Sequence, residues 1–229
     1  AWMGSAFVLL YLKILVLVLA VVISFFMVWR RLREDYQDDQ IFALSLGVVS
    51  GSLTGFILAS LVTFIDLRFW MAVLGGFVSG FFIVKKLGMR YFEILEAGTP
   101  TLFVYLIFLN STSFLIALTA NLFSWHVVAK LLILILSLLM FFYFAKYFRR
   151  FLWYPSGKIG LASLSSLTFY SLSQVGLVYF LGDMLPWVGR ILEVIIGASC
   201  GIGALAMIYL RSGRHTGQDF RLFNIRRRR

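Results

Sequence analysis

Seven apolar stretches follow one another along this chain of 229 residues, and together they account for most of its length. A helix of about 20 residues, rising 1.5 Å per residue, covers the roughly 30 Å hydrocarbon core of a bilayer. The chain is 61% hydrophobic, whereas soluble domains are about 45–50% apolar. The sequence therefore predicts an all-α, polytopic membrane protein with seven transmembrane helices. The expected spans are residues 6–29, 41–65, 69–84, 97–118, 125–148, 159–182 and 186–210.

The Lys and Arg residues occupy every second gap between these stretches. All but four of the 21 lie in or directly beside the first, third or fifth gap or in the C-terminal tail; the exceptions are Lys13, Arg68, Lys130 and Arg190. Basic residues near membrane spans remain in the cytoplasm, so the N-terminus is expected outside and the C-terminus inside. We therefore expect one transmembrane domain over residues 1–210 and a basic cytoplasmic tail over residues 211–229.

Glycines recur at helical spacing in three of the stretches. Such small residues let two helix backbones approach closely, which predicts tight packing within the bundle. Homodimerisation and a lipid-facing groove are the alternatives. The residues expected to pack in this way are Gly47, Gly51, Gly55, Gly76, Gly80, Gly197 and Gly201.

Four charged residues at the expected outer ends of the spans are candidates for binding a lipid headgroup: Arg68, Lys130, Arg190 and Glu193. Charges inside a bilayer are costly and often functional. Each also has a simpler interpretation. Arg68 lies in a tight interfacial turn, Lys130 can extend its amine toward water, and Arg190 can pair with Glu193 one helical turn away.

Two further spans are unusual in composition. Gly98, Pro100 and the polar residues 110–113 predict an interrupted fourth span. The sixth span is rich in hydroxyls, which are expected to form hydrogen bonds between helices or to line a polar pocket. Together they leave open a transport path through the bundle.

The C-terminal tail predicts an electrostatic anchor for anionic lipids at the inner leaflet, besides its role as a topology signal. The anchor residues are Arg221, Arg226, Arg227, Arg228 and Arg229. The chain has two histidines and one cysteine, so neither a metal centre nor another cofactor is expected. No nucleophile or phosphate-loop motif is found, and the basic residues flank apolar segments rather than forming a nucleic-acid-binding patch.

The order of these features resembles the bacterial prolipoprotein diacylglyceryl transferases. The resemblance covers about residues 15–210 and depends on small residues, spacing and basic turns. A basic-then-acidic loop precedes a glycine-rich second span, and a double glycine precedes a basic turn after the third. These segments are residues 30–35, Gly75–Gly76, Lys85–Lys86, residues 93–100 and residues 156–160 with Tyr170. The resemblance implies a seven-span bundle in the plasma membrane of a bacterium.

The charged motifs of that family are missing at the matching positions. Its His-Gly-Gly motif reads Leu74-Gly75-Gly76 here, and residues 108–113 hold no arginine. Gln174 and Val178 stand where the family has Arg and Glu. Acyl transfer needs cations to hold the lipid phosphate and a base to activate the thiol. We therefore expect a non-catalytic relative that binds lipid, in particular anionic phospholipid, or a partner membrane protein. The alternatives are an active transferase with a divergent site, and a small transporter or a subunit of a larger membrane complex.

Overall fold

The computed structural model describes residues 2–61, 68–119, 125–147, 156, 158–181 and 187–213. Over these residues the chain forms seven helices and no strand, which confirms the predicted all-helical fold. Six of the helices, all except α3, are long and apolar enough over the described residues to cross a membrane. Seven crossings and the orientation stay predictions. The helices are α1 (Trp2–Leu32), α2 (Asp38–Leu61), α3 (Arg68–Leu87), α4 (Tyr91–Thr119), α5 (Trp125–Tyr147), α6 (Leu161–Leu181) and α7 (Trp187–Arg211).

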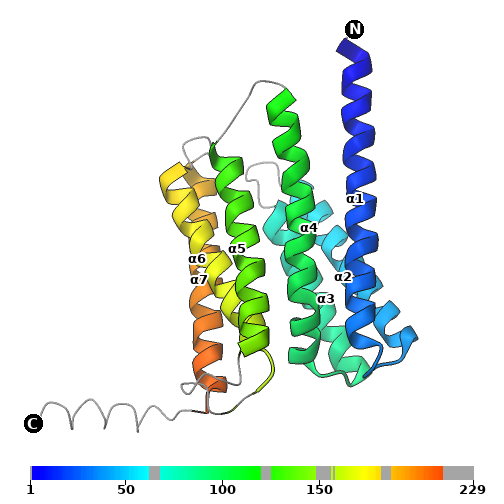
Figure 1. Cartoon of the computed structure of the whole chain (residues 1–229), viewed down its shortest axis with the longest axis vertical. Coiled ribbons are helices and arrows are strands. Elements are labelled where there is room, and N and C mark those ends of the chain that lie inside the picture. Colours follow the sequence, from blue (N-terminus) through cyan, green and yellow to red (C-terminus); the bar gives the residue numbers. More distant parts are fainter. Residues whose placement is uncertain are drawn as a thin grey trace, which may run out of the picture.

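The bundle consists of a helical hairpin and a larger group of helices. Helices α2 and α3 pack closely on each other, and α1, α4, α5, α6 and α7 follow one another as packed neighbours in the order α1–α4–α5–α6–α7. The hairpin has only sparse contacts with α1 and α4. The α1–α2 and α3–α4 connections lie at the same end of the molecule, the lower end in Figure 1. We call this the basic end, after Arg31, Lys85, Lys86, Arg90 and Arg211, which lie there.

Glycines bring the backbones of α2 and α3 into direct contact. A Cβ atom added to Gly51 would lie 2.5 Å from the carbonyl oxygen of Gly75, and one added to Gly75 would meet the carbonyl of Gly51. The hydroxyl of Ser79 donates to the carbonyl of Gly47 across the same interface. Larger residues at these positions would force the two helices apart, so their sequence explains why this hairpin is the closest-packed pair.

Helix α4 is continuous although Pro100 lies inside it, so the prediction of an interrupted fourth span is wrong. Proline has no N–H, which leaves the carbonyl of Glu96, four residues earlier, without its helical partner. Arg31 of α1 donates to that oxygen from Nη1 at 2.8 Å. Asn110 and Thr112 bond within the helix: Asn110 donates to the Leu106 carbonyl at 2.8 Å and Thr112 to the Leu109 carbonyl at 2.7 Å. The neighbouring helix therefore replaces the hydrogen bond that the proline removes.

Helix α6 is buried over most of its length, and small hydroxyl side chains allow this. The hydrogen bonds described for these hydroxyls do not confirm the prediction that they bond mainly between helices. Ser166 and Thr168 donate to carbonyls of α6 itself, at 3.0 and 2.7 Å. Ser163 reaches Glu96 of α4, at 3.3 Å. Most of these hydroxyls thus form their hydrogen bonds within α6. Because the side chains are also small, α4, α5 and α7 can pack around this helix.

Candidate functional site

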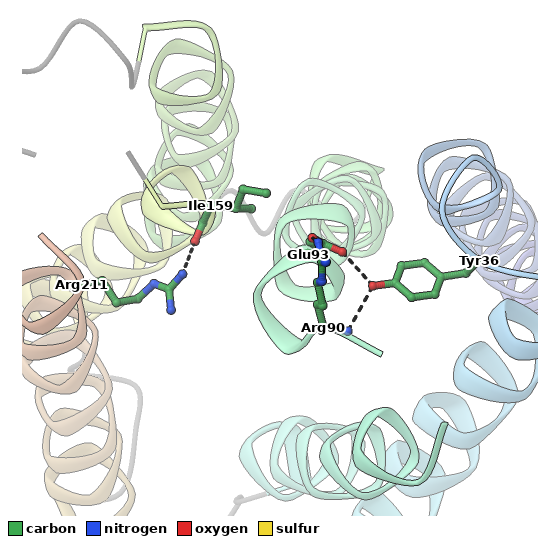
Figure 2. Close-up of polar contacts among 5 residues, drawn as sticks. All are labelled: Tyr36, Arg90, Glu93, Ile159 and Arg211. Atoms are coloured by element: carbon green, nitrogen blue, oxygen red, sulfur yellow. Dashed lines mark hydrogen bonds and ion pairs between the residues drawn. The ribbon is translucent and has the colours of Figure 1, made fainter. Parts of the chain in front are cut away.

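Polar side chains gather in two places, at the basic end and near the opposite end of α5–α7. At the basic end, the hydroxyl of Tyr36 in the α1–α2 connection donates to Glu93 at 2.7 Å and accepts the backbone N–H of Arg90 at 3.1 Å. Figure 2 shows the tyrosine reaching from α1–α2 toward the start of α4. Arg90 also pairs with Glu93 at 2.9 Å. These contacts hold the hairpin connection to α4.

The two members of this network outside the spans have shifted pKa values. Partial burial raises the pKa of Tyr36 above its ordinary value, because the phenolate loses solvation. The hydrogen bond with Glu93 raises the pKa of Arg90. Both groups therefore remain protonated over the whole physiological pH range, and the network serves as a fixed structural connection.

Glu96, one turn further along α4, joins three helices. Its carboxylate accepts hydrogen bonds from the backbone N–H groups of Gly160 and Ser163 and from the Ser163 hydroxyl, at the start of α6. These N–H groups belong to the first turn, where no helical acceptor exists. Arg31 lies 5.2 Å above the Phe141 ring of α5 and donates to the Glu96 carbonyl. Glu96 therefore acts as an N-terminal cap for α6 and as a link between α1, α4 and α6.

Arg211, the last residue of α7, lies on the other side of the α4 start (Figure 2). Its guanidinium carbon is 3.4 Å from the centre of the Phe92 ring, and Nη2 donates to the Ile159 carbonyl at 2.7 Å. Its Nε is buried and has no hydrogen-bond acceptor among the described residues. Within the same residues no carboxylate pairs with Arg211, so this cation is held by a ring and a carbonyl.

The second cluster lies near the ends of α5, α6 and α7 that are remote from the basic end. Glu193 of α7 is close enough to Lys130 of α5 and to Tyr170 of α6 to interact electrostatically with both. Tyr170 is buried and contacts Phe103 edge-on, with ring centroids 5.6 Å apart. We call Lys130, Tyr170, Gln174 and Glu193 the Lys130–Glu193 cluster.

Gln174 completes this cluster because it is one helical turn from Tyr170 on the same face of α6. Its amide nitrogen is buried and has no hydrogen-bond acceptor among the described residues. Arg190 precedes Glu193 by one turn of α7 and is partly buried. Buried amides almost always find a partner, so this one indicates an acceptor outside the described residues.

The structure thus brings together three of the four predicted headgroup candidates at one end of α5–α7: Lys130, Arg190 and Glu193. The fourth, Arg68, begins α3, and its side chain lies outside the described residues. Arg221 and residues 226–229 of the predicted lipid anchor also lie outside them. Gly47, Gly51, Gly55, Gly76 and Gly80 lie between α2 and α3, and Gly197 and Gly201 face α6.

The sequence pattern did not single out Tyr36 or the capping role of Glu96. Tyr36 is a connection residue whose partners are 54 and 57 positions away. Pro100, four residues after Glu96, signals only that the Glu96 carbonyl needs a donor nearby, and it gives no sign that the carboxylate caps α6. Among the described residues, no group of three or more His, Cys, Asp or Glu side chains is placed to hold a metal ion.

A cavity of about 220 Å³ lies between α1 and α4. Its walls are mainly apolar; besides Tyr105, the polar residue that lines it is Thr112. That hydroxyl donates to the Leu109 carbonyl at 2.7 Å, so it is already satisfied within α4. The cavity therefore offers mainly apolar contact. The other lining residues are Ile14, Val16, Leu17, Ala20, Tyr105 and Leu109.

Comparison with known proteins found no matching family model, no matching curated protein and no matching solved structure.

Proposed function

We propose that this chain is a non-catalytic membrane protein, similar in organisation to the diacylglyceryl transferases, that binds the headgroup of an anionic phospholipid at the Lys130–Glu193 cluster. The observation that carries the proposal is the meeting of a cation, a carboxylate and an unsatisfied amide from three helices. Charged groups within apolar helices are costly, and a ligand that satisfies them offsets that cost.

The charges of the cluster favour an anionic ligand. Lys130 and Arg190 contribute two positive charges near the single negative charge of Glu193. A phosphate oxygen would accept hydrogen bonds from the ammonium of Lys130 and from the amide of Gln174. Glu193 can accept from the hydroxyls of a glycerol headgroup. Lys130 and Glu193 each lie close to the end of a candidate span, which is the depth of lipid headgroups.

The missing charged motifs support a non-catalytic role. Beside the lipid, the transfer reaction requires a base positioned at the acceptor thiol. The positions that match the family's arginines carry none in this chain. The distribution of Lys and Arg supports seven crossings with the basic end in the cytoplasm. The lipid site would then face the outer leaflet of a bacterial plasma membrane.

Native mass spectrometry of the full chain in mild detergent tests the lipid site. With added phosphatidylglycerol, the wild type should retain a lipid bound at the cluster, in addition to any lipid bound elsewhere on the protein. Lys130→Met should weaken this binding about tenfold or more, because a charge-assisted hydrogen bond contributes about 1.5–3 kcal/mol. Lys86→Met, at an exposed lysine near the end of α3, is the matched control and should bind like the wild type. Equal binding by both variants would refute the site.

Incubation with phosphatidylglycerol and a lipobox peptide tests the catalytic alternative separately. We expect no diacylglyceryl transfer above a no-protein control. Robust transfer would overturn the non-catalytic proposal and leave the lipid site intact, because binding and transfer are measured independently.

A further inference from the structure

We propose that Arg211 is the centre of a second anion site, at the basic end, that binds a phosphate group. This site lies at the opposite end of α5–α7 from the Lys130–Glu193 cluster and does not depend on the function proposed for that cluster. The proposal rests on how the guanidinium is held and on which of its donors are used.

The guanidinium of Arg211 is fixed in place without an acidic partner. It lies flat enough on Phe92 for a 3.4 Å approach to the ring centre, and one of its nitrogens is bonded to the Ile159 carbonyl. The other donors of this side chain have no acceptor among the described residues, and Nε is buried. A cation that is partly removed from water without a counter-ion is costly, so the arrangement favours an added anion.

The backbone around Arg211 is also fixed. The hydroxyl of Ser156 donates to the Arg211 carbonyl, and the N–H of Ser156 donates to the Ser212 carbonyl at 3.1 Å. Gly213 follows with a φ of 81°, a left-handed conformation that ends the helix and favours glycine. The guanidinium therefore needs little reordering when an anion binds, which lowers the entropic cost of binding.

The depth of the site selects phosphate. Arg211 ends one candidate span, and Arg90 immediately precedes another at the same end of the molecule. The ends of membrane-spanning helices lie at the level of the lipid phosphates. A guanidinium can form two parallel hydrogen bonds with two phosphate oxygens. The charge of Glu93 is already matched by Arg90 and by the Tyr36 hydroxyl, so it does not compete for Arg211. A lipid headgroup and a free phosphate ion share this chemistry.

Isothermal titration calorimetry of the full chain in dodecyl maltoside micelles tests the site. One arm titrates dihexanoylphosphatidylglycerol and the other inorganic phosphate, both in a Lys130→Met background that removes the other proposed site. We expect saturable binding of one equivalent. Tighter binding of the lipid identifies a membrane phospholipid as the natural source, and equal or tighter binding of inorganic phosphate identifies a soluble phosphate.

Three variants separate the site from general electrostatic attraction. Arg211→Gln should weaken binding about tenfold or more, which corresponds to the loss of a charge-assisted pair. Arg211→Lys should fall between Arg211→Gln and the parent, because it keeps the charge and loses the planar fork. Arg30→Gln removes one exposed charge from the same end and should change binding less than twofold.

A circular dichroism melt of each variant shows whether it is folded, and Arg211→Lys provides the comparison if Arg211→Gln is not. Equal losses in Arg30→Gln and Arg211→Gln would overturn the proposal, as would Arg211→Lys binding as tightly as the parent or no saturable binding in either arm.

Discussion

Replacing Gly51 with alanine tests the direct backbone contact between α2 and α3. The added Cβ would lie 2.5 Å from the carbonyl oxygen of Gly75, whereas ordinary contacts begin at 3.4 Å. The helices would have to separate by about 0.9 Å, because the obstacle is backbone that cannot rotate away. Overpacking of this kind costs about 1–3 kcal/mol, and the gain in helix propensity from glycine to alanine offsets at most about 1 kcal/mol. We expect a net loss of about 1–2 kcal/mol.

Gly203→Ala is the matched control, because the same substitution on α7 meets nothing within 4 Å. It should be neutral or stabilise the protein by about 0.5 kcal/mol. Unfolding of both variants in mixed SDS and dodecyl maltoside micelles, followed by tryptophan fluorescence, gives the two free energies. Equal values for the two variants would refute the reasoning. An effect of Gly51→Ala that appears only as a change of oligomeric state would instead favour the homodimer alternative.

Three further variants test the basic end, each by the same unfolding measurement. Tyr36→Phe should lower the free energy of unfolding by about 1 kcal/mol. Because folding raises the pKa of Tyr36, the wild type should keep this extra stability below the ordinary pKa of 10.0. It should lose it as the pH rises through the raised pKa. Equal slopes above pH 10 in both proteins would contradict this. Glu96→Ala should cost about 2 kcal/mol by uncapping α6, and Glu96→Gln, which keeps an acceptor, should cost less. Arg31→Met should cost about 1–3 kcal/mol in the wild type and clearly less beside Pro100→Ala, which restores the helical N–H for the Glu96 carbonyl. Additive costs in that double-mutant cycle would show that Arg31 does not compensate for the proline.

The number and positions of the helices could be predicted because apolar stretches and their basic boundaries are local features. The fourth span shows where this reasoning stops. Proline predicts an interruption only if its freed carbonyl stays unpaired, and here Arg31, 65 residues earlier, supplies the donor. The residues near Pro100 in the sequence give no information about this distant donor. In the sequence, Arg31 at the end of one span and Pro100 in another have no visible connection; only the packing of α1 beside α4 shows that they act together.

The sequence predicted individual residues of the candidate site, but it did not predict that they lie together. Lys130 and Glu193 stood out because each is a charge inside an apolar stretch, but nothing in the pattern indicated that α5 and α7 place them together beside Tyr170. The hydroxyls of α6 misled for a different reason. Serine and threonine in helices can bond to their own preceding turn, so their number does not measure the contacts between helices. The described bonds of Ser166 and Thr168 are of this local kind.

The α2–α3 hairpin illustrates how a bilayer changes the rules of assembly. Its two helices are joined by backbone contacts, yet large apolar side chains such as Phe42, Leu53 and Phe82 remain exposed on it. In water these would drive the hairpin onto its neighbours, but lipid tails are equally apolar, so this driving force is absent within the membrane. The position of the hairpin must then be set by specific contacts, and these are concentrated at the basic end. The hydrogen bonds of Tyr36 and the 2.7 Å hydrogen bond between Trp29 and Asp38 thus determine the position of the hairpin more strongly than comparable bonds would in a soluble protein.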